Sequence, residues 1–167
     1  MTVTAGPARR ATRRRAGLLV VAALALVTLR LFVVAPLRVD GDSMAPTLRS
    51  GDVAVMRKFG APHAGQVVSL RDPQDGSPVV KRVVALGGQT VEIRDAYLYV
   101  DGTEVDEPFV DHSRIDGVYF GPVTVPAGNV FVLGDSRNGS IDSRIFGPVP
   151  AGSVTGRELV RLWPPVR

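Results

Sequence analysis

The chain has 167 residues, of which 45% are hydrophobic, and this length suits one ordinary domain with a short accessory segment. Its net charge of +4 is concentrated in residues 1–15, which hold five arginines and no acid, so the remainder does not have the charge of a nucleic-acid-binding domain. The absence of cysteine excludes disulfides, zinc–thiolate sites and cysteine nucleophiles, and two separated histidines, His63 and His112, do not favour a metal cluster.

Residues 16–37, AGLLVVAALALVTLRLFVVAPL, form the first predicted element, a single transmembrane helix. As a helix they would be about 33 Å long, enough for a hydrocarbon core of roughly 30 Å. The basic tail of residues 1–15 predicts a cytoplasmic N-terminus and an extracytoplasmic remainder, anchored in the cell membrane. Arg30 leaves the outer end open, because the helix could end at Leu29 or continue with Arg30 reaching the interface. A cleavable signal peptide is the alternative, although no small-x-small site closes the segment.

Residues 38–167 are predicted to form a mainly β domain, an antiparallel sheet or open barrel. Short apolar or alternating runs, separated by Gly, Pro, Asp and Asn, cover residues 52–56, 66–70, 79–86, 90–93, 97–100, 129–133 and 153–163. In YLYVDGTEV, residues 97–105, Asp101 and Gly102 lie between two strand-like runs and indicate a hairpin. The polar stretch at about 95–122 is predicted to be a hairpin or loop excursion from the main sheet.

Lys81 is the first candidate catalytic residue. It lies among valines and is one of two lysines, with Lys58, in a chain of 20 basic residues. In a strand it would share a face with Val79, Val83 and Ala85. Burial on such a face lowers the pKa of an amine and can turn it into a base, which a guanidinium cannot become. The strand alone is also compatible with a lysine at a sheet edge whose amine reaches water.

Ser43 is the candidate nucleophile. It follows a Gly-Asp turn after an apolar run, and Pro46 restricts Ala45 to extended or turn conformations. A serine at such a junction, with backbone N–H groups nearby, suits a nucleophile beside an oxyanion hole, although it could also cap a helical turn. Since neither histidine lies in a recognisable catalytic context, a lysine is the better candidate base, as in Ser-Lys dyads.

The third stretch is GDSRNGSIDSRIFGPVP, residues 134–150, in which Asp-Ser-Arg occurs at 135–137 and at 142–144 with Ser140 between them. One interpretation is a turn-rich loop with exposed ion pairs that contribute little. The other is a rigid loop whose ion pairs hold a hydroxyl group that orients an amine.

Together these stretches resemble the bacterial type I signal peptidases, membrane-anchored serine proteases that remove signal peptides from exported proteins. The similarity runs from about Leu29 to Pro150. GDSMAPTL at 41–48 is similar to the nucleophile motif and VVKRVVALGG at 79–88 to the base motif, while residues 134–150 are similar to the last motif.

The resemblance implies that Ser43 is the nucleophile and Lys81 the general base, and that Ser140 contacts the lysine amine. By the same match, Asp142 and Arg144 brace the loop. Many members carry a serine two positions before the nucleophile. This chain has Gly41 there, so its oxyanion hole is expected to rely on backbone N–H groups.

The implied substrate is the small-x-small end of a signal peptide, bound as an extended strand beside residues 37–42 and the base strand. Shallow apolar pockets for its side chains would be formed by Val39, Met44, Leu48 and Val80. The expected partners are signal peptides and the lipid bilayer, and no metal, cofactor or nucleic acid is expected.

Two other functions stay open on the sequence. A self-cleaving Ser-Lys protease would share the dyad but would have no use for residues 16–37. A non-catalytic membrane-anchored β-domain would be indicated if Ser43, Ser140 and Lys81 lay far apart.

Overall fold

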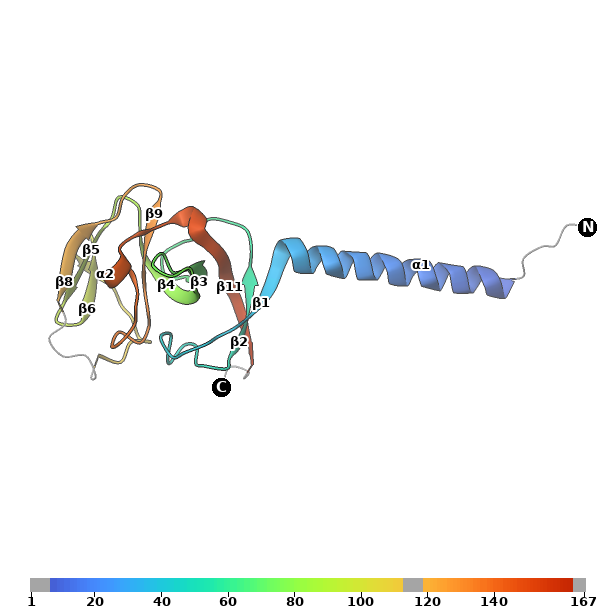
Figure 1. The fold of residues 1–167 in the computed structure, drawn as a ribbon, viewed down its shortest axis with the longest axis horizontal. Helices are drawn as coiled ribbons and strands as arrows, with labels where there is room; N and C mark the ends of the chain where they lie inside the picture. The colour runs from blue at the N-terminus through green and yellow to red at the C-terminus, as the bar shows by residue number, and fades with distance from the viewer. Residues whose placement is uncertain (1–6, 113–118, 164–167) are drawn as a thin grey trace, which may run out of the picture. The chain divides into compact units, whose positions relative to one another are not determined.

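The computed structural model describes residues 7–112 and 119–163 (Figure 1). The chain divides into two compact units, Met1–Val34 and Ala35–Arg167. The first unit is helical and consists of α1 (Pro7–Thr28) followed by the short π-helix η1 (Leu29–Val33). None of the helices in the described part of the chain is both long enough and apolar enough to cross a membrane.

The helix differs at both ends from the predicted helix over residues 16–37. It begins at Pro7 because proline fits the first turn, where its missing N–H would have had no helical partner. It ends at Val33 because Pro36 disfavours the helical conformation for the residue before it, and the chain becomes extended as β1 (Val34–Arg38). Arg30 lies within η1, so the helix does not stop at Leu29.

The second unit contains a seven-stranded sheet in the order β1-β2-β11-β3-β4-β9-β10. From β2 to β10 in this order, neighbouring strands pair in the antiparallel direction, as the sequence predicts for a mainly β domain. Besides β1, its strands are β2 (Val53–Arg57), β3 (Val67–Arg71), β4 (Pro78–Leu86), β9 (Asn129–Leu133), β10 (Val149–Pro150) and β11 (Val154–Trp163).

A separate four-stranded sheet, in the order β7-β6-β5-β8, includes parts of the stretch at about 95–122, for which the sequence predicts a hairpin or loop excursion from the main sheet. Its strands are β5 (Thr90–Arg94), β6 (Tyr97–Val100), β7 (Thr103–Glu104) and β8 (Phe120–Thr124). The predicted hairpin is present between β6 and β7, and its turn residues Asp101 and Gly102 both have positive φ angles, as a tight hairpin turn requires. In Figure 1 this sheet lies on the opposite side of the domain from β2 and β11.

The strand β4 connects the cores of the two sheets. Val83 packs with Val68 in one apolar cluster, whereas Val84 and Ala85 pack with Phe131 and with residues of the four-stranded sheet in another. The change follows from a register irregularity in the β4–β9 pairing between Val83 and Ala85, which redirects the side chains. The prediction that Ala85 shares the face of Lys81 and Val83 is therefore wrong.

Candidate active site

Ser43 lies in the turn of residues 41–48 between β1 and β2. The turn is held by backbone bonds from Ala45 N–H to the Asp42 carbonyl and from Leu48 N–H to the Met44 carbonyl. It forms no regular helix, so Ser43 is not a helix cap. The Ser43 carbonyl accepts a hydrogen bond of 3.1 Å from Ser136 N–H, which joins this turn to the loop of residues 134–142.

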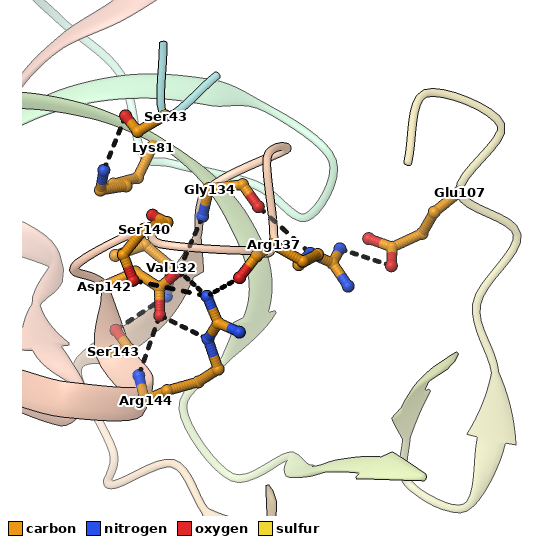
Figure 2. Close-up of polar contacts among 10 residues, drawn as sticks. All are labelled: Ser43, Lys81, Glu107, Val132, Gly134, Arg137, Ser140, Asp142, Ser143 and Arg144. Atoms are coloured by element: carbon orange, nitrogen blue, oxygen red, sulfur yellow. Dashed lines mark hydrogen bonds and ion pairs between the residues drawn. The ribbon is translucent and has the colours of Figure 1, made fainter. Parts of the chain in front are cut away.

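Lys81 projects from β4 toward this serine, and its Nζ donates a hydrogen bond of 2.9 Å to Ser43 Oγ (Figure 2). The two residues are 38 positions apart in the chain, so the contact depends on the fold. Only 3% of the Lys81 surface is exposed. The expectation that a non-catalytic domain would hold these two side chains far apart is not met.

The surroundings of Lys81 favour its neutral form. Lys81 lies directly opposite the fully buried Val68 on β3, on the face where Val79 and Val83 also pack. Burial among these valines lowers the pKa of the Lys81 amine below the ordinary lysine value, the carboxylates of Asp142 and Asp72 oppose this shift, and Arg144 adds to it.

Ser140 is close to this pair but does not make the predicted contact. Its residue is 5% exposed, and its Oγ is buried with no hydrogen-bond partner in the part of the chain that the structure describes. The expected hydrogen bond to the Lys81 amine is therefore absent from this structure. A buried hydroxyl without a partner is uncommon in folded proteins.

Asp142 and Arg144 make the contacts expected of a brace. Asp142 is fully buried, caps the short helix α2 (Ser143–Phe146) and accepts the N–H of Gly134 at 3.0 Å. Arg144 donates from Nε and Nη2 to the Asp142 carboxylate, both at 2.8 Å. Its Nη2 also donates to the carbonyl of Arg137 at 2.9 Å (Figure 2). Asp142 and Arg144 thus join the end of the loop of residues 134–142 to its start and its middle.

Gly134 is a site residue that the sequence analysis missed. A Cβ atom on this residue would lie 2.6 Å from the Ser43 carbonyl oxygen and still closer to Ser140 Oγ. Only a glycine therefore lets the end of β9 approach both serines. The one signal in the sequence was a glycine directly after the apolar run of residues 129–133.

Two arginine–carboxylate pairs were also missed. Arg82 binds Asp135 through two hydrogen bonds, of 2.8 and 2.6 Å, and the Asp135 side chain is 1% exposed. Arg137 forms an ion pair with Glu107, and both side chains are 2% exposed. Glu107 lies between β7 and β8 and is 30 residues from Arg137, so no local pattern could reveal this partner.

A cleft of about 460 Å³ opens at the Ser43–Lys81 pair. One side is formed by residues 40–43, which include Gly41, and another by Val79 of β4. Several of the remaining lining side chains are polar, namely Asp72, Asp75, Ser77, Ser136 and Asn138. The cleft thus lies between the turn of residues 41–48 and the start of β4.

The apolar residues predicted to form substrate pockets lie in a common cluster. Val39, Met44 and Leu48 pack with Val67, and Val80 packs against them. Val39, Met44 and Leu48 are each at most 4% exposed. In this structure they thus form a closed apolar layer, to which the turn of residues 41–48 contributes Met44 and Leu48. The predicted shallow pockets are not open. Among the described residues, no group of three or more His, Asp or Glu side chains is arranged to hold a metal ion.

Comparison with known proteins gives consistent results. The family model for "Signal peptidase, peptidase S26" matches residues 12–163. A protein named "Probable signal peptidase I-1" from Synechocystis sp. is 36% identical over 162 residues, covering 90% of this chain and 82% of the relative. Signal peptidase I from Bacillus caldolyticus is 36% identical over 159 residues, covering 86% of this chain and 87% of the relative.

A solved structure gives the same match at the level of the fold. The crystal structure of a signal peptidase I from Enterococcus faecalis V583 superposes with a TM-score of 0.54 at 32% sequence identity. The superposition covers 61% of this chain and 99% of that one.

Proposed function

Because the chain belongs to the signal peptidase family, peptidase S26, and is a serine endopeptidase, we propose that it cleaves signal peptides from exported preproteins with a Ser43–Lys81 dyad. The observation that carries this proposal is the 2.9 Å contact between Ser43 Oγ and the buried Lys81 amine, whose pKa is lowered by burial. A lysine serves as a base only when it is neutral, and burial favours that form by lowering the pKa of the Lys81 amine.

In the proposed reaction, neutral Lys81 accepts the hydroxyl proton of Ser43 while Oγ attacks the scissile carbonyl carbon. The resulting ammonium gives this proton to the leaving amine as the peptide bond breaks, which leaves an acyl-enzyme ester on Ser43. Lys81 then takes a proton from a water molecule, and the hydroxide attacks the ester. The ammonium returns the proton to Ser43 Oγ as the acyl group leaves.

The oxyanion of each tetrahedral intermediate needs donors, and Gly41 has no hydroxyl to offer. The Ser43 N–H makes no hydrogen bond to any part of the chain that the structure describes, so it is available for this role. A backbone N–H held at a turn is a donor that needs no rearrangement during the reaction.

The substrate is proposed to bind as an added strand along β4. This strand pairs with β9 only from Arg82 onward, so on that edge residues 78–81 extend beyond the register with β9. The cleft beside them is bounded by residues 40–43. An extended signal-peptide end would place its scissile bond next to Ser43 there, with small side chains directed at the layer of Val39, Met44, Leu48 and Val80, which would have to open slightly.

We further propose that α1 attaches the enzyme to the membrane with the catalytic domain on the outer side. The large apolar side chains from Leu18 to Leu29 are exposed, each to at least 45%. We propose that these side chains contact lipid and that the arginines of residues 9–15 lie on the cytoplasmic side. Accessibility labelling of intact cells should find residues 38–167 outside, and labelling of the tail from outside would contradict this orientation.

The function is tested by incubating the full chain in detergent with a signal-peptide-bearing preprotein and mapping the new N-terminus. We expect cleavage after a small-x-small sequence by the wild-type protein and none by Ser43→Ala. Cleavage at other sites, or undiminished cleavage by Ser43→Ala, would contradict the proposal.

A further inference from the structure

The segment Glu107–Phe109, which follows β7 in the connection to β8, holds the loop of residues 134–142 at two separate points. Glu107 forms the buried ion pair with Arg137. Two residues later, the ring of Phe109 lies 3.9 Å from the guanidinium carbon of Arg82, which in turn binds Asp135 on the loop. Both contacts are made across the domain by residues that do not line the cleft at Ser43 and Lys81.

The two anchored loop residues flank the one that contacts the nucleophile. Ser136 lies between Asp135 and Arg137, and its N–H donates to the Ser43 carbonyl at 3.1 Å. Arg137 also donates from Nε to the carbonyl of Gly134 at 3.1 Å, and Gly134 is the residue that approaches both Ser43 and Ser140 (Figure 2). A displacement of this loop would therefore move the Ser43 backbone.

We propose that Glu107 and Phe109 are positioning residues for the reaction, which act through Arg137 and Arg82 on the loop that holds Ser43 in register with Lys81. The inference rests on the proposed function of that dyad. It assigns a role to the four-stranded sheet, which carries neither Ser43 nor Lys81. The sheet presents the segment that fixes the loop, and a misplacement of about 1 Å at a reacting group can lower a rate on the order of 100-fold.

The proposed effect is one of geometry and not of charge at Lys81. The carboxylates that raise the pKa of the Lys81 amine are Asp142 and Asp72, and the guanidinium that lowers it is that of Arg144. Glu107 and Arg137 are not among these groups. Loss of the contacts made by Glu107 and Phe109 should therefore reduce kcat, while the pH at which the reaction reaches half its maximal rate stays the same.

The test compares Glu107→Gln with Glu104→Gln in the full chain in detergent. Glu104 is an exposed acid on β7 that accepts a hydrogen bond from the Tyr99 hydroxyl, so it is a matched control away from the loop. We expect Glu107→Gln to lower kcat per folded molecule about 10- to 100-fold with KM changed less than about 3-fold. Glu104→Gln should have wild-type kcat.

A second pair keeps the test decisive if Glu107→Gln does not fold, because removing one partner of a buried ion pair is strongly destabilising. Phe109→Leu removes the ring beside Arg82, whereas Phe109→Tyr retains it and Phe109 is only half-buried. We expect Phe109→Leu to lower kcat about 3- to 10-fold, and Phe109→Tyr to restore it.

Wild-type kcat per folded molecule in both Glu107→Gln and Phe109→Leu, or in Phe109→Leu alone if the former is unfolded, would overturn the positioning role. A melting temperature that falls without any change in kcat would show a purely structural role, and a shifted pH midpoint would show an electrostatic one. If the wild-type protein itself does not cleave the preprotein, the proposed function has failed instead, so the two failures are distinguishable.

Discussion

The turn of residues 41–48 and the loop of residues 134–144 meet at Ser43, but their polar side chains differ in burial and in the number of fixed partners. Among the described residues the Ser43 side chain has one hydrogen-bond partner, Lys81, and residues 40–42 beside it are exposed. The loop contains charged side chains that are almost fully buried, among them Asp135, Arg137 and Asp142, each with a specific partner.

The difference separates reacting groups from the groups that support them. In the proposed mechanism Ser43 and Lys81 exchange protons and admit a substrate, which is compatible with few fixed contacts around their polar atoms. The loop gains its rigidity from buried ion pairs, and removal of one partner of such a pair is strongly destabilising. Changes of Ser43 and Lys81 should therefore abolish chemistry while sparing stability, and changes of the buried charged residues of the loop should affect both.

The largest effect is expected from the dyad itself. Ser43→Ala and Lys81→Ala should each lower kcat on the order of 10⁴-fold or more, since groups that act as a unit are lost together. Lys81→Arg should be equally inactive, because a guanidinium keeps its charge and cannot act as the base. Preprotein cleavage measures the activity, and circular dichroism should give the wild-type spectrum for Ser43→Ala. A Lys81→Arg variant that retains activity would contradict the mechanism.

Gly134→Ala should have the next largest effect, because its Cβ would overlap with Ser140 and with the Ser43 carbonyl. We expect kcat to fall about 100-fold, as the turn and the loop are forced apart, and the protein to lose about 1–3 kcal/mol of stability from overpacking. Gly152→Ala is the matched control, since a Cβ there has no neighbour within 4 Å. Equal kinetics for the two variants would show that the close approach at Gly134 has no catalytic role.

Ser140 and Asp142 distinguish support of the reaction from support of the fold. Ser140 Oγ has no partner in the described structure, so Ser140→Ala should leave the melting temperature unchanged. If the hydroxyl binds the Lys81 amine during the reaction, kcat should fall roughly 10- to 100-fold. Asp142→Ala should lower both quantities, because it removes the partner of Arg144 and of Gly134 N–H. An unchanged kcat for Ser140→Ala would refute its predicted role.

The smallest effect is a shift in pH dependence. Only neutral Lys81 is active, so kcat/KM should rise as the pH increases through the pKa of its amine. The Asp72 carboxylate raises this pKa by stabilising the ammonium form. Asp72→Asn should thus lower the pKa and move the rising limb to lower pH. Asp75→Asn is the control, because Asp75 lines the same cleft but is not among the groups that shift the pKa of Lys81. A shift to higher pH in Asp72→Asn would contradict this assignment.

Local patterns predicted much of the β domain. Alternating and apolar runs indicated the strands that became β2 to β6, β9 and β11, and Asp101-Gly102 indicated the hairpin, because these features depend on neighbouring residues. The polar stretch at 95–122 was taken as an excursion from the main sheet. Part of it pairs with β5, and no local signal can reveal such partners. The predicted helix extends beyond the observed end at Val33 because the apolar run continues there. Pro36 disfavours the helical conformation for the residue before it, and the chain is extended from Val34.

The candidate site shows the same limit. The contact between Ser43 and Lys81 and the bracing contacts of Asp142 and Arg144 were expected from their motifs. Gly134 and the Glu107–Arg137 pair were not, since their roles depend on close approaches between distant segments. The residues predicted to line substrate pockets pack in one cluster, but the sequence could not show that this layer is closed.

The central claim is that Lys81 becomes neutral more readily than an ordinary lysine, and a nuclear magnetic resonance titration tests it most directly. Lysine labelled with ¹³C at Cε would give two side-chain signals, since the chain has only Lys58 and Lys81, and Lys81→Met would assign them by removing one. The account predicts that the Lys81 signal titrates with a midpoint below the ordinary value of 10.5. A midpoint at or above 10.5 would mean that the amine stays protonated beside Ser43, and it would contradict the proposed role of Lys81 as the base.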